Sequence, residues 1–185
     1  MKVLIACEYS GTVRDAFIRL GHDALSCDLL PTDVPGPHYQ GDVRDILNNG
    51  WDLMIAHPPC TYLCSSGLHW NKRRPERAAQ TEEALQFVHF LLTSNIPKIA
   101  LENPIGCIST RIRKPDQTVQ PWQYGHGECK ATCLWLKGLS KLNATNIVQG
   151  REPRMWRLPP SADRWKIRSQ TYQGIADAMA QQWGT

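Results

Sequence analysis

The chain has 185 residues, of which 42% are hydrophobic and 21% charged, enough for one globular domain and too apolar for an intrinsically disordered protein. Lys and Arg number 21 against 17 Asp and Glu, and the resulting net charge of +4 does not by itself indicate nucleic-acid binding. The sequence has no run of about 18 apolar residues, so no membrane-spanning helix is predicted. The apolar run at the start of the sequence is too short for a signal peptide, so a reducing compartment is expected. The seven cysteines are therefore predicted to be free thiols in a cytoplasmic protein.

Short apolar runs alternate with helical patterns along the chain. Strands are predicted at residues 3–7, 24–28, 52–57, 98–104 and 132–136, and helices at residues 12–20, 75–94 and 174–183. Residues 29–40 hold three prolines and are predicted to form a loop, while residues 143–168 show no clear period. The alternation predicts an α/β fold with a mainly parallel sheet and helices on both faces.

The first strand leads into the turn Glu8–Gly11, then a helix, then a strand that ends at Asp28. This layout is typical of a nucleotide-type pocket, where a glycine lets the ligand approach the helix start and an acid holds ribose hydroxyls. The pattern is weak because Gly11 is the only glycine in the turn. Asp28 is therefore either a ribose partner or an exposed carboxylate at the end of a strand.

A cysteine follows the strand at residues 52–57. Pro58–Pro59 must end that strand, because proline lacks the backbone donor, so Cys60 is predicted at the edge of the sheet where ligands bind. Ser65–Gly67 then predicts a mobile loop. From its position alone, Cys60 could be a small buried thiol, a nucleophile or a metal ligand.

A second strand ends in Glu102–Pro104. The carboxyl ends of parallel strands meet at one edge, so Glu102 and Cys60 are expected to converge. The carboxylate would then be an acid or a hydrogen-bond partner for a thiol nucleophile.

These two segments resemble the signatures of the DNA cytosine methyltransferases that methylate carbon 5, and in particular short phage-encoded members of that family. Pro59–Gly67 is similar to the family's Pro-Cys loop, and Glu102–Pro104 to its Glu-Asn-Val element. Looser matches cover nearly the whole chain. The resemblance implies catalytic roles for Cys60, Glu102, Asn103 and Lys130. It implies cofactor binding by Glu8, Tyr9, Ser10, Gly11, Asp28, Asp42, Pro58 and Gly174, and no metal.

The resemblance implies a Rossmann-like fold that transfers a methyl group from S-adenosylmethionine to carbon 5 of cytosine in nucleic acid, with DNA as the expected substrate. A Cys60 thiolate would add to carbon 6, and Glu102 would bind the exocyclic amine and ring nitrogen. The target base must leave its stack, and residues 61–77 would close over it. Predicted nucleic-acid contacts are Ser65, Ser66, Lys72, Arg73 and Arg74, although such basic clusters are often only solvated surface.

The chain also departs from the family pattern. Ser10–Gly11 is a reduced glycine turn, Thr61 replaces the usual glutamine, and Lys130 stands where the family has tandem arginines. The interval between Glu102 and Tyr172 is too short for a target-recognition domain. We therefore expect one catalytic domain over residues 1–185, with slight sequence specificity or a partner protein that supplies it.

Three other hypotheses remain open. The pairs Cys60/Cys64 and Cys129/Cys133, with histidines nearby, could bind zinc. Enzymes that methylate exocyclic amines carry Asp/Asn-Pro-Pro-aromatic at this strand end, and residues 57–60 share only the two prolines. A catalytically decayed methyltransferase fold could bind nucleic acid, with tryptophans such as Trp70, Trp122 and Trp156 stacking on bases.

Overall fold

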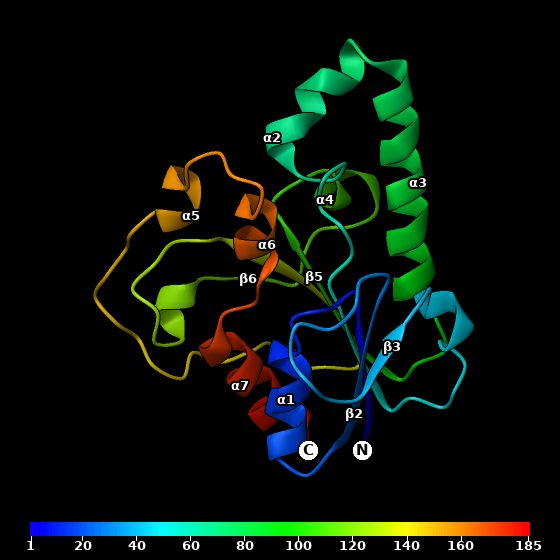
Figure 1. Cartoon of the computed structure of the whole chain (residues 1–185), viewed down its shortest axis with the longest axis vertical. Coiled ribbons are helices and arrows are strands. Elements are labelled where there is room, and N and C mark those ends of the chain that lie inside the picture. The colour runs from blue at the N-terminus through cyan, green and yellow to red at the C-terminus, as the bar shows by residue number, and fades with distance from the viewer.

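The computed structural model describes residues 1–185 and contains one seven-stranded sheet (Figure 1). The strands are β1 (Lys2–Ala6), β2 (Asp23–Asp28), β3 (His38–Gln40), β4 (Leu53–Ala56), β5 (Lys98–Pro104), β6 (Gln117–Val119) and β7 (Thr132–Lys137). Their order across the sheet is β3-β2-β1-β4-β5-β7-β6. Strands β1 to β5 are parallel, and β7 runs antiparallel to both β5 and β6.

Helices cover both faces of this sheet (Figure 1). The α-helices are α1 (Thr12–Arg19), α2 (Ser65–Leu68), α3 (Pro75–Leu92), α4 (Ile108–Arg111), α5 (Arg154–Arg157), α6 (Arg164–Ser169) and α7 (Gln173–Trp183). Three short 3-10 helices, η1 (Val43–Asp45), η2 (His69–Lys72) and η3 (Pro121–Gln123), complete the fold. Helix α3 packs on one face, and α1 and α7 pack together on the other. No helix is both long enough and apolar enough to cross a membrane.

The central strands read as unbroken apolar runs because both of their faces are buried. Successive side chains of a strand point to opposite faces, so Leu4 joins the core under α3 while Val3 and Ile5 join the core under α1 and α7. Strand β4 is fully buried throughout. The predicted α/β architecture with a mainly parallel sheet and helices on both faces is confirmed.

The sheet register aligns three strand ends. Ala56 of β4 pairs with Ala6 of β1 and with Leu101 of β5. The residues one position further on, Cys7, His57 and Glu102, therefore lie at one edge of the sheet, which we call the rim. Because β7 is antiparallel, it begins at the rim, where Thr132 pairs with Pro104. Lys130, just before β7, is consequently brought to the same edge.

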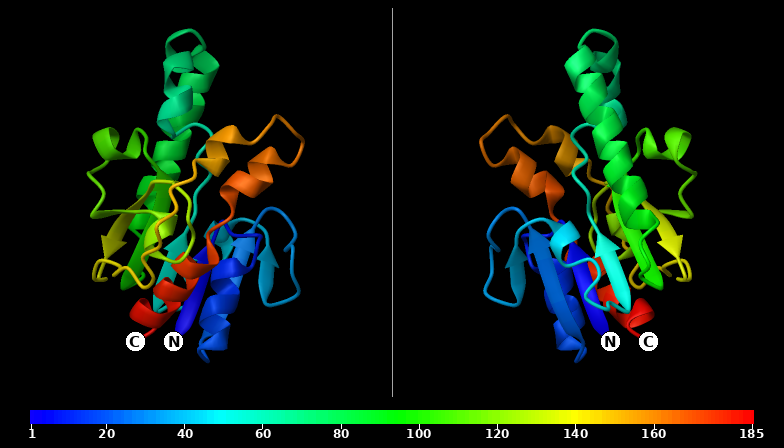
Figure 2. Two further views of the ribbon diagram at one scale, coloured as in Figure 1. Left: turned by 90° about the vertical axis from the view of Figure 1, so that its left-hand side faces the viewer. Right: turned by 90° about the vertical axis from the view of Figure 1, so that its right-hand side faces the viewer.

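Four local predictions were incomplete or wrong. Strand β3 lies within the segment predicted to be only loop, and β7 is antiparallel. Helix α2 covers all of the predicted mobile loop Ser65–Gly67, while α5 and nearly all of α6 lie in the segment without a period. A three-residue strand and helices of four to six residues are shorter than the windows in which hydrophobic periods are recognised. Figure 2 shows the α2–η2 segment and the start of α3 projecting beyond the sheet, with α5 and α6 beside them.

Candidate active site

Cys60 lies at the rim just beyond β4. Its carbonyl oxygen accepts hydrogen bonds from the backbone N–H groups of Leu63 and Cys64, both at 3.0 Å, so the chain enters a helical turn directly after the prolines. The residue is exposed and borders a cavity of about 100 Å³, which argues against a purely packing role. Local desolvation, with Cys64 and Glu102 nearby, raises the pKa of the Cys60 thiol, and the charge of Lys130 opposes that rise.

Glu102 borders the same cavity and contacts a histidine that the sequence did not single out as catalytic. The Nδ1 atom of His57 lies 3.1 Å from Oε2 of Glu102, and both side chains are mostly buried. Burial disfavours the charged carboxylate, but the hydrogen bond and charge of His57, together with Lys130, outweigh it and lower the pKa of Glu102. Glu102 is therefore a carboxylate held by a histidine at the cavity wall.

Asn103 acts on the prolines that precede the cysteine. Its Nδ2 group donates a hydrogen bond of 2.8 Å to the carbonyl oxygen of Pro58. Its own Oδ1 is buried without a hydrogen-bond partner, and so is Nε2 of His57. Both residues line the small cavity, and each has one buried polar atom without a partner.

Lys130 supplies positive charge to this cavity. Its Nζ donates a 3.0 Å hydrogen bond to the carbonyl oxygen of Gln170 and lies 5.7 Å from the ring centre of Tyr172. Burial lowers the pKa of Lys130, and the nearby Glu102 carboxylate and Cys60 thiol oppose that shift. The predicted catalytic residues Cys60, Glu102, Asn103 and Lys130 are thus brought together.

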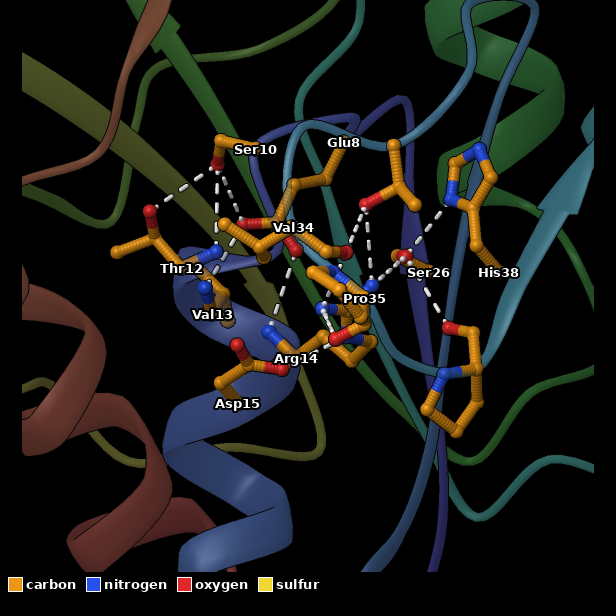
Figure 3. Close-up of polar contacts among 12 residues, drawn as sticks. Glu8, Ser10, Thr12, Val13, Arg14, Asp15, Ser26, Val34, Pro35 and His38 are labelled. Carbon is orange, nitrogen blue, oxygen red and sulfur yellow. Dashed lines mark hydrogen bonds and ion pairs between the residues drawn. The ribbon is translucent and has the colours of Figure 1, made fainter.

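The turn after β1 is built around a buried carboxylate (Figure 3). Glu8 accepts hydrogen bonds from the backbone of Val13 at 2.7 Å and Arg14 at 3.2 Å, and from the Ser10 hydroxyl at 3.2 Å. It therefore caps the N-terminus of α1, where the helix dipole favours negative charge. Gly11 has φ 74°, a left-handed conformation that suits glycine. Glu8 therefore stabilises the turn through hydrogen bonds to nearby residues of the turn and of α1.

Arg14 is a buried cation that the sequence did not reveal, because an arginine in an amphipathic helix is expected on the polar face. Its guanidinium donates to the hydroxyls of Ser26 and Thr32 and to the carbonyl oxygens of Val34 and Pro35, all at 3.2–3.3 Å (Figure 3). It thereby ties the loop after β2 to helix α1.

A larger cavity of about 420 Å³ opens beside the small one. Its polar walls include Asp28, where β2 ends, and Asp42, which caps η1. Leu29, Tyr62 and Phe87 are among its less polar walls. The two carboxylates can bind the hydroxyl groups of a ribose, and the apolar residues can pack against a flat base. The larger cavity therefore suits the nucleoside part of a cofactor.

The two cavities share a wall formed by Cys7, Pro58 and Pro59. The predicted cofactor residues divide between them. Asp28 and Asp42 border the larger cavity, Glu8, Tyr9 and Ser10 border the smaller one, and Pro58 borders both.

Two predicted cofactor glycines, Gly11 and Gly174, border neither cavity. The N–H group of Gly174 donates a 3.0 Å hydrogen bond to Nε2 of His126. A Cβ atom at position 174 would lie 1.9 Å from the carbonyl oxygen of Tyr124. Gly174 therefore allows close packing at the start of α7.

Helix α6, which no sequence pattern predicted, closes one side of the small cavity. The Tyr9 hydroxyl lies 2.8 Å from the Ser169 hydroxyl, and the Tyr9 ring centre lies 5.8 Å from that of Trp165. Arg168, Ser169 and Gln170 line the cavity opposite the strand ends.

The predicted nucleic-acid residues lie on the loop that follows Cys60, outside both cavities. The base of this loop is fixed by two backbone hydrogen bonds, from Ser65 to Ile105 at 3.0 Å and from Cys107 to Leu63 at 2.9 Å. Ser65 and Ser66 are exposed, as are the cations Lys72, Arg73 and Arg74. None of these three cations forms an ion pair with a carboxylate.

The zinc hypothesis gains no support from the structure. No group of three or more His, Cys, Asp or Glu side chains lies close enough together to hold a metal ion. All seven cysteines are free thiols.

Comparisons with known structures agree on the fold. A protein described as a DNA modification methyltransferase encoded within a prophage of E. coli superposes with a TM-score of 0.53 at 15% identity, over 86% of this chain and 55% of that one. Entamoeba histolytica methyltransferase EhMeth superposes with a TM-score of 0.52 at 14% identity, over 88% of this chain and 61% of that one. This chain has the Rossmann-like methyltransferase fold.

The chain spans little more than half the length of these two structures. No family model matches it, and no curated protein matches its sequence. At identities this low, the likeness establishes the fold, and the function has to be argued from the site.

Proposed function

We propose that the protein transfers a methyl group from S-adenosylmethionine to carbon 5 of cytosine in nucleic acid, through a covalent bond to Cys60. One observation carries the proposal. Cys60 and Glu102 border one small cavity, and that cavity shares a wall with a larger one bearing Asp28 and Asp42. A nucleophile for a pyrimidine ring and a pocket for a nucleoside cofactor are therefore adjacent.

The chemistry requires a nucleophile because carbon 5 of cytosine is not reactive enough unaided. Addition of the Cys60 thiolate to carbon 6 makes carbon 5 an enamine-type nucleophile. S-adenosylmethionine, when bound, supplies the electrophilic methyl group. Loss of the carbon 5 proton to a base then lets the bond between Sγ and carbon 6 break, which restores the ring and the free thiol.

The remaining rim residues have distinct roles in this scheme. Glu102 accepts a hydrogen bond from the exocyclic amine, and His57 holds that carboxylate at the cavity wall. Lys130 favours the thiolate, since its charge opposes the rise in the pKa of Cys60. Asn103 holds the Pro58 carbonyl and so positions the turn that carries Cys60.

The cofactor would sit against Asp28 and Asp42 in the larger cavity, with Tyr62 and Phe87 beside its ring. Gly11 and Gly174 would contribute by shaping the turn after β1 and the start of α7. DNA is the first choice of substrate, and a partner protein could add target specificity.

A methyl-transfer assay tests the proposal. The protein is incubated with methyl-labelled S-adenosylmethionine and, in separate reactions, DNA, RNA and dCMP. We expect label at carbon 5 of cytosine with the wild type, and a loss on the order of 10⁶-fold with Cys60→Ala, the scale seen when a nucleophile is removed. Cys129→Ala, at a position that borders neither cavity, is the matched control and should retain activity.

Three outcomes would contradict the mechanism. Label in cytosine that persists in Cys60→Ala would exclude the covalent route. Label on the exocyclic amine would favour the amino-methylating alternative. Absence of cofactor binding, with nucleic acid still bound, would favour a decayed fold that serves only as a binding module.

A further inference from the structure

Arginines without a carboxylate partner are concentrated in two segments. We call residues 61–77 the loop wall and residues 151–170 the α5–α6 wall. Every arginine outside these walls pairs with a carboxylate: Arg14, Arg19, Arg44, Arg111 and Arg113. Within the walls only Arg154 does so, whereas seven arginines do not: Arg73, Arg74, Arg77, Arg151, Arg157, Arg164 and Arg168. Arginines left without acidic partners are available to phosphates.

The exposed tryptophans occur in the same two segments. Trp70 lies on the loop wall, and Trp156 and Trp165 lie on the α5–α6 wall, with Trp156 80% exposed. The other four tryptophans are buried or partly buried. Exposed apolar groups that gather in one region mark interaction sites more often than singly scattered ones do.

Arginines contact two tryptophan rings. On the loop wall, the guanidinium groups of Arg74 and Arg73 lie 5.2 and 5.9 Å from the ring centre of Trp70. On the α5–α6 wall, the guanidinium of Arg151 lies 3.8 Å from the ring centre of the partly buried Trp122. Flat guanidinium and indole groups side by side form surfaces on which bases stack while phosphates are neutralised.

Both walls meet at the small cavity. The loop wall begins immediately after Cys60, and the α5–α6 wall ends at Arg168, Ser169 and Gln170, which line the cavity. Figures 1 and 2 show that the α2–η2 segment and the pair α5 and α6 lie apart from each other, both beyond the same end of the sheet. A strand that delivers a base to Cys60 would therefore contact both walls.

We propose that the substrate is a single-stranded segment of nucleic acid, whose bases flanking the target stack on Trp70 and Trp156. This inference rests on the proposed function and specifies its substrate. A paired duplex hides the faces of its bases, so exposed indoles would gain little from it, whereas unpaired bases present those faces freely. Unpaired cytosine also needs no energy for extraction from a duplex.

Equilibrium binding to the folded Cys60→Ala protein tests the proposal without depending on methyl transfer. The probes are a dye-labelled oligonucleotide of about 16 nucleotides as single-stranded DNA, as RNA, and as a DNA duplex of the same sequence. We expect the single strands to bind more tightly than the duplex. Trp70→Ala and Trp156→Ala should each weaken single-strand binding by about five- to 150-fold, the range for one base–aromatic stack.

Ile147→Ala removes an apolar side chain outside both walls whose exposure lies between those of Trp70 and Trp156, and this matched control should bind as before. Arg74→Ala should lower the slope of log affinity against log salt by about 0.7, the value for one phosphate contact on a single strand. Circular dichroism verifies that each variant is folded.

Tighter binding of the duplex, or tryptophan variants that bind like the Ile147→Ala control, would overturn the single-strand inference and leave the proposed reaction intact. Failure to bind any oligonucleotide at low salt would also overturn it. If the wild type then methylated dCMP, the chemistry at Cys60 would stand with a free nucleotide as substrate. If no substrate were methylated, the proposed function would fail as well.

Discussion

The Nδ1 atom of His57 lies 3.1 Å from Oε2 of Glu102, and this pair joins the ends of two neighbouring parallel strands. The contact follows from the register, because each residue is one position beyond the paired residues Ala56 and Leu101. His57 precedes the Pro-Pro-Cys turn, so one hydrogen bond links the carboxylate to the segment that carries the nucleophile.

Removal of His57 should alter the titration of Glu102. Without the histidine, burial of the carboxylate is less opposed and the pKa of Glu102 rises. In His57→Ala the acidic limb of the kcat–pH profile should therefore move to higher pH, and kcat should fall on the order of 100-fold. His89→Ala, on the exposed face of α3, is the control. A lower kcat with an unshifted profile would indicate only a structural role.

The reactivity of Cys60 should depend on Lys130. Only the thiolate is alkylated, and the raised pKa of Cys60 predicts an iodoacetamide reaction whose midpoint lies above the ordinary value of about 8.5. In Lys130→Ala the lost positive charge should raise that midpoint further, so the rate at pH 8 should fall. Mass spectrometry of the Cys60 peptide gives the rate. Lys137→Ala, at the other end of β7, should leave it unchanged; an equal shift in both variants would contradict a local effect.

Asp28 should contribute to cofactor affinity. Its Oδ1 accepts a hydrogen bond from the Leu30 backbone at 2.9 Å, which holds the carboxylate at the edge of the larger cavity. Asp28→Ala should weaken binding of S-adenosylmethionine by about 10- to 150-fold, as expected for loss of a hydrogen bond to a charged group. Calorimetric titration measures this change. Asp45→Ala removes an exposed carboxylate outside the cavity, and equal affinities of the two variants would exclude the role of Asp28.

Arg14 should matter for stability far more than an exposed arginine on the same helix. Arg14→Ala leaves the Val34 and Pro35 carbonyl groups without this donor, at an expected cost of about 2–5 kcal/mol in the free energy of unfolding. Arg19→Ala breaks a half-exposed pair with Asp177 and should cost less than about 1 kcal/mol. Urea denaturation compares the two. Similar losses would show that the buried guanidinium is not a major support of the loop.

The sequence predicted those parts of the fold that depend on residues close together along the chain. The runs of β1, β4 and β5 are apolar because both faces are buried, and parallel strands place Cys60 and Glu102 at one edge. The role of His57 depends on register between strands 45 positions apart, although its place beside a strand end was a usable signal. Arg14 could not be predicted, because its partners come from the loop after β2 and only the tertiary fold buries it.

The small helices near the site were also beyond prediction. Helices α5 and α6 are too short to show a period, so nothing in the sequence placed Arg168 and Gln170 at the cavity. The direction of β7 was not specified by its composition either. That direction brings Lys130 to the rim, and only the pairing with β5 establishes it.

The distribution of indole rings gives the protein a built-in optical signal. Trp51, Trp135 and Trp183 lie in the core, whereas Trp70, Trp156 and Trp165 face water. Emission from the exposed set should be red-shifted and readily quenched by iodide, while the core set stays protected. A molecule that covers the two walls would shift the emission to the blue and shield it from iodide, so unlabelled protein can report occupancy of this surface.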